Sequence, residues 1–128
     1  MKEITELIDA VLNHATHFLK EHGEFYPFAI IRKTDGTLQP FNIYEGEEYP
    51  SPTELLKQLK KVLDEGFDQY GYDSFAIGIN VTVTRDGEKK DAIQIKLNHK
   101  KEYYEDSFVP YDVVGDSVEL FDLYTENS

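Results

Sequence analysis

The chain begins with apolar residues that recur at steps of three and four. They run from Ile4 to Leu19, with polar residues between them. This spacing places the apolar side chains on one stripe of an α-helix. Gly23 follows the stripe and can adopt the left-handed conformation that closes a helix. The pattern therefore predicts a first helix that ends at Gly23.

The pattern then changes to the aromatic and β-branched residues that are typical of strands. Phe25 to Lys33 and Leu38 to Tyr44 flank the dipeptide Asp35-Gly36, which favours a tight turn. Together they predict a β-hairpin. Because Pro27 has no backbone N–H, we expect that end of the first strand to lie at an edge, at a bulge or outside the regular sheet.

A second helix is predicted from a strong start signal. In the segment Ser51-Pro52-Thr53-Glu54, serine and glutamate have the spacing of a capping box, and proline takes the first helical position. Apolar residues with helical spacing follow from Leu55 to Leu63, and Gly66 lies three residues beyond Leu63. We expect the helix to end near Gly66.

The pattern predicts strands for the rest of the chain. Residues 75–84 alternate apolar side chains with small or polar ones, Asp86-Gly87 forms a turn, and residues 93–98 alternate again. Two more extended segments, at about 103–113 and 118–124, are joined through Gly115-Asp116.

The predicted order is helix, two strands, helix and four strands. Strands that follow one another through short turns pair antiparallel, whereas a parallel sheet would need helices between them. We therefore predict a single α+β domain over residues 1–128, with two helices packed on one face of a mainly antiparallel sheet.

Composition narrows the classes of function. The chain is 40% hydrophobic, which favours a folded domain, and its formal net charge of −12 repels nucleic acid and anionic lipid surfaces. It has no cysteine, no phosphate-binding glycine motif and no serine elbow. No long apolar run or signal peptide is present, so we expect a cytoplasmic protein. Because no cofactor-binding or catalytic motif occurs, we expect no cofactor, and the sequence favours a non-catalytic protein.

Histidines do not indicate a metal site. His14 and His17 are spaced to share a helix, but no acidic residue accompanies them in the arrangement that metal-binding helices use. His14 falls at the flank of the apolar stripe and His17 nearly opposite it. We expect both to face solvent and to bind no metal.

The last 27 residues hold the most unusual composition of the chain. Residues 102–128 contain eight acidic residues and no lysine or arginine, and aromatic residues alternate with the acids at their start. Such a segment can be an edge strand protected by charge, or an interface in which aromatic side chains anchor a basic partner. For the interface we predict three anchors and three charge complements: Tyr103, Tyr104, Tyr111, Glu105, Asp106 and Asp112.

A second unusual segment, Gly23 to Phe28, places three aromatic residues around a proline. Phe25 and Phe28 can anchor the corner in the core, while Glu24 and Tyr26 can lie at the mouth of a pocket. This pocket, between sheet and helices and lined also by Ala76 and Gly78, would suit a small-ligand-binding protein or an enzyme. For an enzyme, the first catalytic candidates are Tyr26, Asp106, Tyr111 and Asp112.

The chain resembles a family of small bacterial proteins of uncharacterised function. The resemblance rests on the run Gly23-Glu24-Phe25-Tyr26-Pro27-Phe28, the Asp-Gly hairpin, the proline-led second helix, the strand from Lys90 to Ile93, and Val109-Pro110-Tyr111. It implies a bacterial cytosolic origin and no activity. In size and charge the chain is also similar to immunity proteins, which occlude a basic toxin, and its element order is similar to profilin-like and roadblock-like folds.

These observations favour a non-catalytic interaction protein, comparable to an immunity protein, that blocks a basic protein partner. A homodimer formed through an edge strand is a further possibility that the sequence leaves open.

Overall fold

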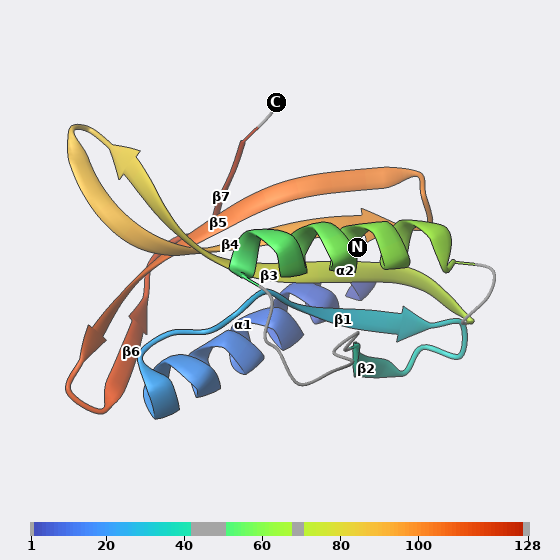
Figure 1. Cartoon of the computed structure of the whole chain (residues 1–128), viewed down its shortest axis with the longest axis horizontal. Coiled ribbons are helices and arrows are strands. Elements are labelled where there is room, and N and C mark those ends of the chain that lie inside the picture. The colour runs from blue at the N-terminus through green and yellow to red at the C-terminus, as the bar shows by residue number, and fades with distance from the viewer. Residues whose placement is uncertain (1, 42–50, 68–70, 127–128) are drawn as a thin grey trace.

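The structure is a computed structural model that describes residues 2–41, 51–67 and 71–126. Its helices and strands, coloured along the chain in Figure 1, are α1 (Lys2–His22), β1 (Phe28–Lys33), β2 (Leu38–Phe41), α2 (Pro52–Glu65), β3 (Tyr72–Arg85), β4 (Glu88–His99), β5 (Tyr103–Val114), β6 (Ser117–Leu120) and β7 (Tyr124–Thr125). The strands form a sheet in the order β2-β1-β3-β4-β5-β6, all pairs antiparallel, and β7 pairs with β5. The predicted α+β class and element order are confirmed, with β7 as an additional short strand.

Both helices begin or end where their capping residues predict. Gly23 has φ 75° at the end of α1, and its N–H donates to the Leu19 carbonyl over 2.9 Å. Ser51 caps α2: its Oγ accepts from the Glu54 N–H over 3.2 Å, and Pro52 follows at the first helical position. Each helix buries one stripe of apolar residues, including Leu7 and Val11 on α1 and Leu59 and Leu63 on α2.

The predicted hairpins are also present. Asp86 and Gly87 both have positive φ, at 53° and 81°, which matches the two-residue turn that suits the twist of paired strands. At the β1–β2 turn the Thr37 N–H donates to Asp35 Oδ1 over 2.9 Å. Pro27 immediately precedes β1 and lies outside the regular sheet, as predicted. The part of the second predicted strand beyond residue 41 lies outside the described residues.

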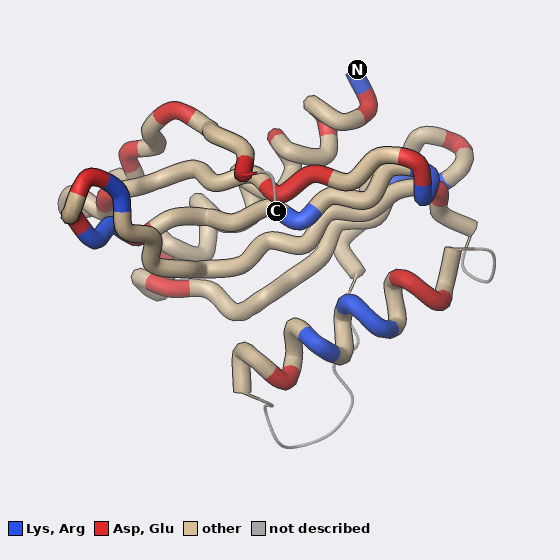
Figure 2. Tube along the Cα trace, turned by 90° about the horizontal axis from the view of Figure 1, so that it is seen from above, with Lys and Arg blue, Asp and Glu red and all other residues tan. Residues whose placement is uncertain are grey.

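The two helices lie on opposite faces of the sheet, so the prediction that they share one face is wrong. The core that contains Leu7 and Val11 of α1 also holds Ala76, whereas Leu59 and Leu63 of α2 pack with Phe75 and Ile77. Figure 2 shows α2 on one side of the strands and the N-terminal helix on the other. The physical reason is β3, which is apolar or small on both faces and therefore needs cover on both.

The sheet divides at one end. β4 pairs with β5 as far as Ala92 and Pro110, and from Tyr111 onward β5 pairs with β6. In Figure 1 the β3–β4 hairpin and the β5–β6 hairpin diverge from this point. We call residues 111–123 the β5–β6 arm.

Candidate functional site

Helix α2 covers only part of its face of the sheet. It packs on β1 and β3, and its core partners there are apolar. On β4 the residues that face the same side are polar: Asn98 is paired in register with Phe75, and Lys96 with Ile77. Residues paired directly across antiparallel strands share a face, so the change from apolar to polar marks where the cover by α2 ends.

A groove of about 500 Å³ follows this boundary. One wall is the side of α2, the floor is β3 and β4, and the other wall comes from β5 and β7. We call it the α2–β5 groove, and its lining comprises Lys60, Asp64, Phe75, Ile77, Lys96, Leu97, Asn98, Tyr103, Tyr104, Glu105, Asp106, Thr125 and Glu126. The structure thus brings together four of the predicted binding residues, Tyr103, Tyr104, Glu105 and Asp106.

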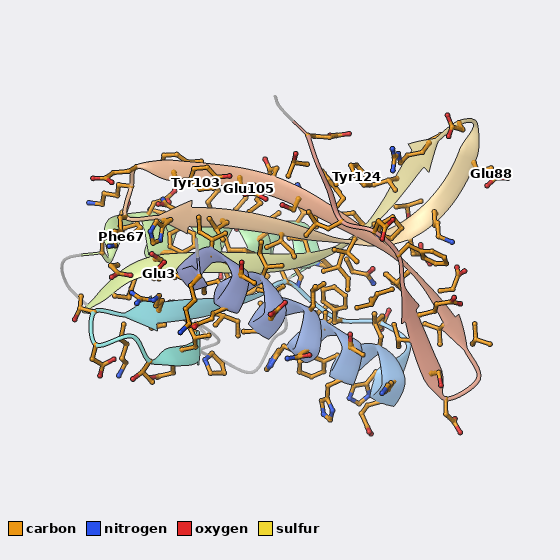
Figure 3. The ribbon with its side chains drawn as sticks, turned by 180° about the vertical axis from the view of Figure 1, so that it is seen from behind. Glu3, Phe67, Glu88, Tyr103, Glu105 and Tyr124 are labelled. Atoms are coloured by element: carbon orange, nitrogen blue, oxygen red, sulfur yellow. The ribbon has the colours of Figure 1, made fainter. Side chains whose placement is uncertain are left out.

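Two of these residues form a hydrogen-bonded pair. The Tyr103 hydroxyl donates to Glu105 Oε2 over 2.5 Å, and the Ser107 hydroxyl donates to Glu105 Oε1 over 2.6 Å. The hydrogen bond to Glu105, and then its negative charge, raises the pKa of Tyr103. Figure 3 shows both side chains near the start of β5. The carboxylate of Glu105 is therefore held in place on the α1 side of the sheet, because Glu105 is paired in register with Leu97 of the core under α1.

Asp106 is neutralised from within the chain. Lys96 Nζ lies 3.2 Å from its Oδ1, and Gln94 Nε2 donates to the same oxygen over 3.3 Å. The pair is half-exposed and connects neighbouring strands. Asp106 therefore connects two strands of the sheet. Its negative charge is less available to a partner than the absence of bases from residues 102–128 indicated.

Asn98 lies beneath the groove and is only 5% exposed. Its Oδ1 accepts from the Lys101 N–H over 3.0 Å, which stabilises the turn between β4 and β5, where Lys100 and Lys101 both have positive φ. Among the residues that the structure describes, none accepts a hydrogen bond from its Nδ2. The residue is thus nearly buried, and its Nδ2 has no partner in the described chain but is still reached by solvent, since Arg32 Nε is the one enclosed side-chain nitrogen or oxygen of the described residues without a partner.

The β5–β6 arm exposes apolar side chains. Across residues 2–41, 51–67 and 71–126, eight large hydrophobic side chains are exposed, and all except Tyr26 lie between Tyr103 and Leu123. Tyr104 borders the groove, and Tyr103 lies beside Glu105 on the opposite face of the sheet. The five on the arm are Val113, Val114, Leu120, Phe121 and Leu123.

The acids of the arm differ in how they are paired. Asp112 is 3.0 Å from Lys90 Nζ, and the same lysine lies 4.2 Å from the centre of the Phe121 ring. No salt bridge within the described part of the chain involves Asp116, Glu119 or Asp122. The free negative charge of the arm therefore comes from these three residues, none of which was among the predicted site residues.

Tyr111 is not a surface anchor, so that prediction is wrong. Its side chain is 5% exposed and belongs to the core under α1, and its hydroxyl donates to Asn80 Oδ1 over 2.7 Å. Burial, followed by the negative charge of Asp91, raises the pKa of Tyr111. It faces inward because strand alternation places Tyr111 on the same side as Val109, toward α1.

The predicted pocket around Tyr26, Ala76 and Gly78 is filled. Ala76 is fully buried in the core, and a Cβ built on Gly78 would lie 2.6 Å from Phe28 Cζ and 3.0 Å from Val11 Cγ1. Small residues on β3 thus allow the N-terminal helix and Phe28 to approach closely, leaving no room for a ligand. Glu24 and Tyr26 are exposed just before β1 and do not line the α2–β5 groove.

The histidines are divided between surface and core. His17 is exposed as predicted, but His14 is half-buried, with its ring centre 4.7 Å from that of Phe28. Burial, followed by the charge of His17, lowers the pKa of His14. His99 is buried, and its Nδ1 lies 2.8 Å from the Ser74 hydroxyl. No cluster of three or more metal-ligating side chains occurs among the described residues.

The sequence contains one signal for the groove, in the contrast between β3 and β4. Ile93, Ile95 and Leu97 on β4 alternate with polar residues, while β3 is apolar on both faces. This contrast indicates that β3 is covered twice and β4 once, which leaves an open sheet face beside the second helix.

No protein family, curated protein or solved structure shows significant similarity to this chain. No helix in the described ranges is both long and apolar enough to cross a membrane.

Proposed function

We propose that this chain is a non-catalytic binding protein whose C-terminal strands dock on a basic protein partner. One observation carries the proposal: seven of the eight exposed large hydrophobic side chains of the described residues lie between Tyr103 and Leu123. Over residues 102–128 every charged side chain is acidic. Clustered apolar and aromatic side chains are a frequent mark of protein interfaces.

The charges around the apolar side chains favour a partner of opposite sign. Asp116, Glu119 and Asp122 have no salt bridge within the described chain, so they are available to a partner's lysines or arginines. The net charge of −12 would also speed the encounter with a basic surface. A second copy of this chain would instead bring these acids against one another, which disfavours a homodimer through the arm.

The mechanism would be steric and electrostatic occlusion. The apolar residues of the β5–β6 arm would contact the partner's apolar surface, and the three acids would select a basic rim around it. In this proposal Tyr103 and Tyr104 remain anchors and Glu105 remains a charge complement. Asp106 and Asp112 contribute less negative charge, because Lys96 and Lys90 already pair with them. An immunity-like inhibitor of a basic protein is the form of this function that we propose.

Affinity capture with matched variants tests the proposal. Val114→Ser with Leu123→Ser removes two exposed apolar side chains from the arm, and Tyr26→Ser removes the one exposed large hydrophobic side chain of the described residues that lies elsewhere. We expect a basic protein from an extract of the source organism to bind the wild type and Tyr26→Ser but not the double variant. Capture of the same proteins by all three would contradict the proposal.

A further inference from the structure

The α2–β5 groove has the properties of a binding site for a polypeptide segment. Asn98 is 95% buried, yet no described residue pairs with its Nδ2, and it lines the groove. Because solvent still reaches Nδ2, this donor is available to a ligand in the groove. A backbone carbonyl of a bound segment would accept this hydrogen bond.

The charges of the groove favour a cation. On the α2 side of the sheet its lining contains three carboxylates, Asp64, Asp106 and Glu126, and two lysines, while the side chain of Glu105 lies on the opposite face. Since Lys96 pairs with Asp106, the remaining lysine, Lys60, is outnumbered by the carboxylates of Asp64 and Glu126. A lysine or arginine side chain entering the groove would restore the balance of charge.

The aromatic rim suits the same ligand. Tyr104 is 66% exposed and is paired in register with Asn98 on the groove side of the sheet, while Phe75 and Ile77 supply apolar lining. A cation over an exposed tyrosine ring gains a cation–π interaction, and its aliphatic stem packs on apolar surface. Because the exposed Tyr104 borders the groove, it is open to solvent. Such a groove suits an extended chain better than a small molecule, which needs most of its surface enclosed.

We propose that the α2–β5 groove receives an extended segment of a protein partner, with a backbone carbonyl on Asn98 Nδ2 and a lysine or arginine side chain between Tyr104 and the carboxylates of Asp64 and Glu126. The inference rests on the proposed function, because it assumes a basic protein partner. It adds a second contact, separate from the β5–β6 arm, and states what that contact recognises.

Peptide selection followed by NMR tests this inference on the full chain. A phage-displayed library of random 12-residue peptides is selected on the wild type, with the Tyr104→Ser variant as counter-target. The best peptide is synthesised in two forms, as selected and with each lysine and arginine replaced by glutamine. Both forms are titrated into the ¹⁵N-labelled chain.

We expect the selected peptides to share a lysine or arginine and to shift the side-chain NH₂ resonances of Asn98. The glutamine form of the peptide, and the Tyr104→Ser variant, should each bind at least about tenfold more weakly. Tyr26→Ser, the matched change of an exposed tyrosine outside the groove, should bind within about twofold of the wild type. A merely structural role of Asn98 predicts none of these ligand-dependent shifts.

Three results would overturn the inference: no peptide enriched over the counter-target, enriched peptides without basic residues, or resonance shifts that map outside the groove. Its failure is distinguishable from failure of the proposed function. If the arm variant loses a basic protein partner while the groove binds no peptide, only the inference fails. If peptides bind the groove but no basic protein is captured through the arm, the proposed function fails.

Discussion

Gly78 shows how one residue determines the packing between α1 and the sheet. Its position is crowded because an added Cβ would lie 2.6 and 2.8 Å from ring atoms of Phe28 and 3.0 Å from Val11. The requirement is purely one of space, since Gly78 is absent from the residues with positive φ.

We predict that Gly78→Ala lowers the free energy of unfolding by about 1–3 kcal/mol, because the core must shift to admit a methyl group. Chemical denaturation monitored by circular dichroism would measure the change. Combining it with Phe28→Leu, which makes room at the same place, should cost less than the sum of the two single changes. Strict additivity would show that the two residues are not coupled.

His14 gives a prediction for pH. Its pKa in the folded chain is lowered from an ordinary value of 6.5, chiefly by burial and then by the charge of His17. The unfolded chain therefore takes up this proton at higher pH than the folded chain does. Stability is retained above pH 6.5 and falls as the pH drops from that value toward the folded pKa.

We expect the free energy of unfolding to decrease between about pH 7.5 and 5.5, a window that includes the unperturbed histidine pKa. His14→Gln should reduce this decrease, whereas His17→Gln, at an exposed position, should largely retain it. An NMR titration of the His14 ring with a midpoint at or above 6.5 would refute the prediction.

At the scale of elements, helix α2 forms one wall of the groove through Lys60 and Asp64, and its stability depends on how its first turn is capped. Ser51 satisfies the Glu54 N–H over 3.2 Å. We predict that Ser51→Ala destabilises the chain by about 1 kcal/mol and that Ser51→Asp, which keeps a capping oxygen, does not. Urea unfolding curves of the three proteins would test this. Equal midpoints for wild type and Ser51→Ala would be inconsistent with a capping role.

The elements themselves could be predicted because each has a local signal. Gly23 ends α1, Ser51 and Pro52 begin α2, and Asp86-Gly87 joins β3 to β4, as the sequence indicated. These signals depend on backbone conformation within a few residues. They need no knowledge of what lies across the sheet.

The face on which α2 packs could not be read from such local signals. It depends on which side of β3 each helix covers. The groove depends on the strand register as well, because the register pairs Asn98 with both Phe75 and Tyr104. The same holds for Tyr111: an aromatic residue beside acids looks exposed in the sequence, but strand alternation turns it into the core.

For the whole molecule, the fold shows that part of the negative charge of the C-terminal stretch is neutralised by a neighbouring strand. In the sequence, residues 102–128 contain no base, yet β4 lies beside β5 and supplies Lys96 to Asp106 and Lys90 to Asp112. Of the six acids in this stretch that have no salt bridge within the described residues, three, Asp116, Glu119 and Asp122, lie on the β5–β6 arm beside its exposed apolar side chains. The centre of the candidate interface is therefore farther along the chain than the sequence predicted.

The salt dependence of partner binding by a charge-neutralised arm tests the central claim most directly. The variant Asp116→Asn, Glu119→Gln, Asp122→Asn would be compared with Glu6→Gln, Asp9→Asn, Glu88→Gln, which removes the same charge from α1 and the β3–β4 hairpin. Binding of the captured basic protein would be measured by calorimetry at low and high salt.

We predict that the arm variant binds at least about tenfold more weakly at low salt and loses most of its salt dependence, because its rim charges no longer meet the partner. The control variant should stay close to the wild type in both respects. Equal affinity and equal salt dependence for the two variants would contradict docking through the acidic arm.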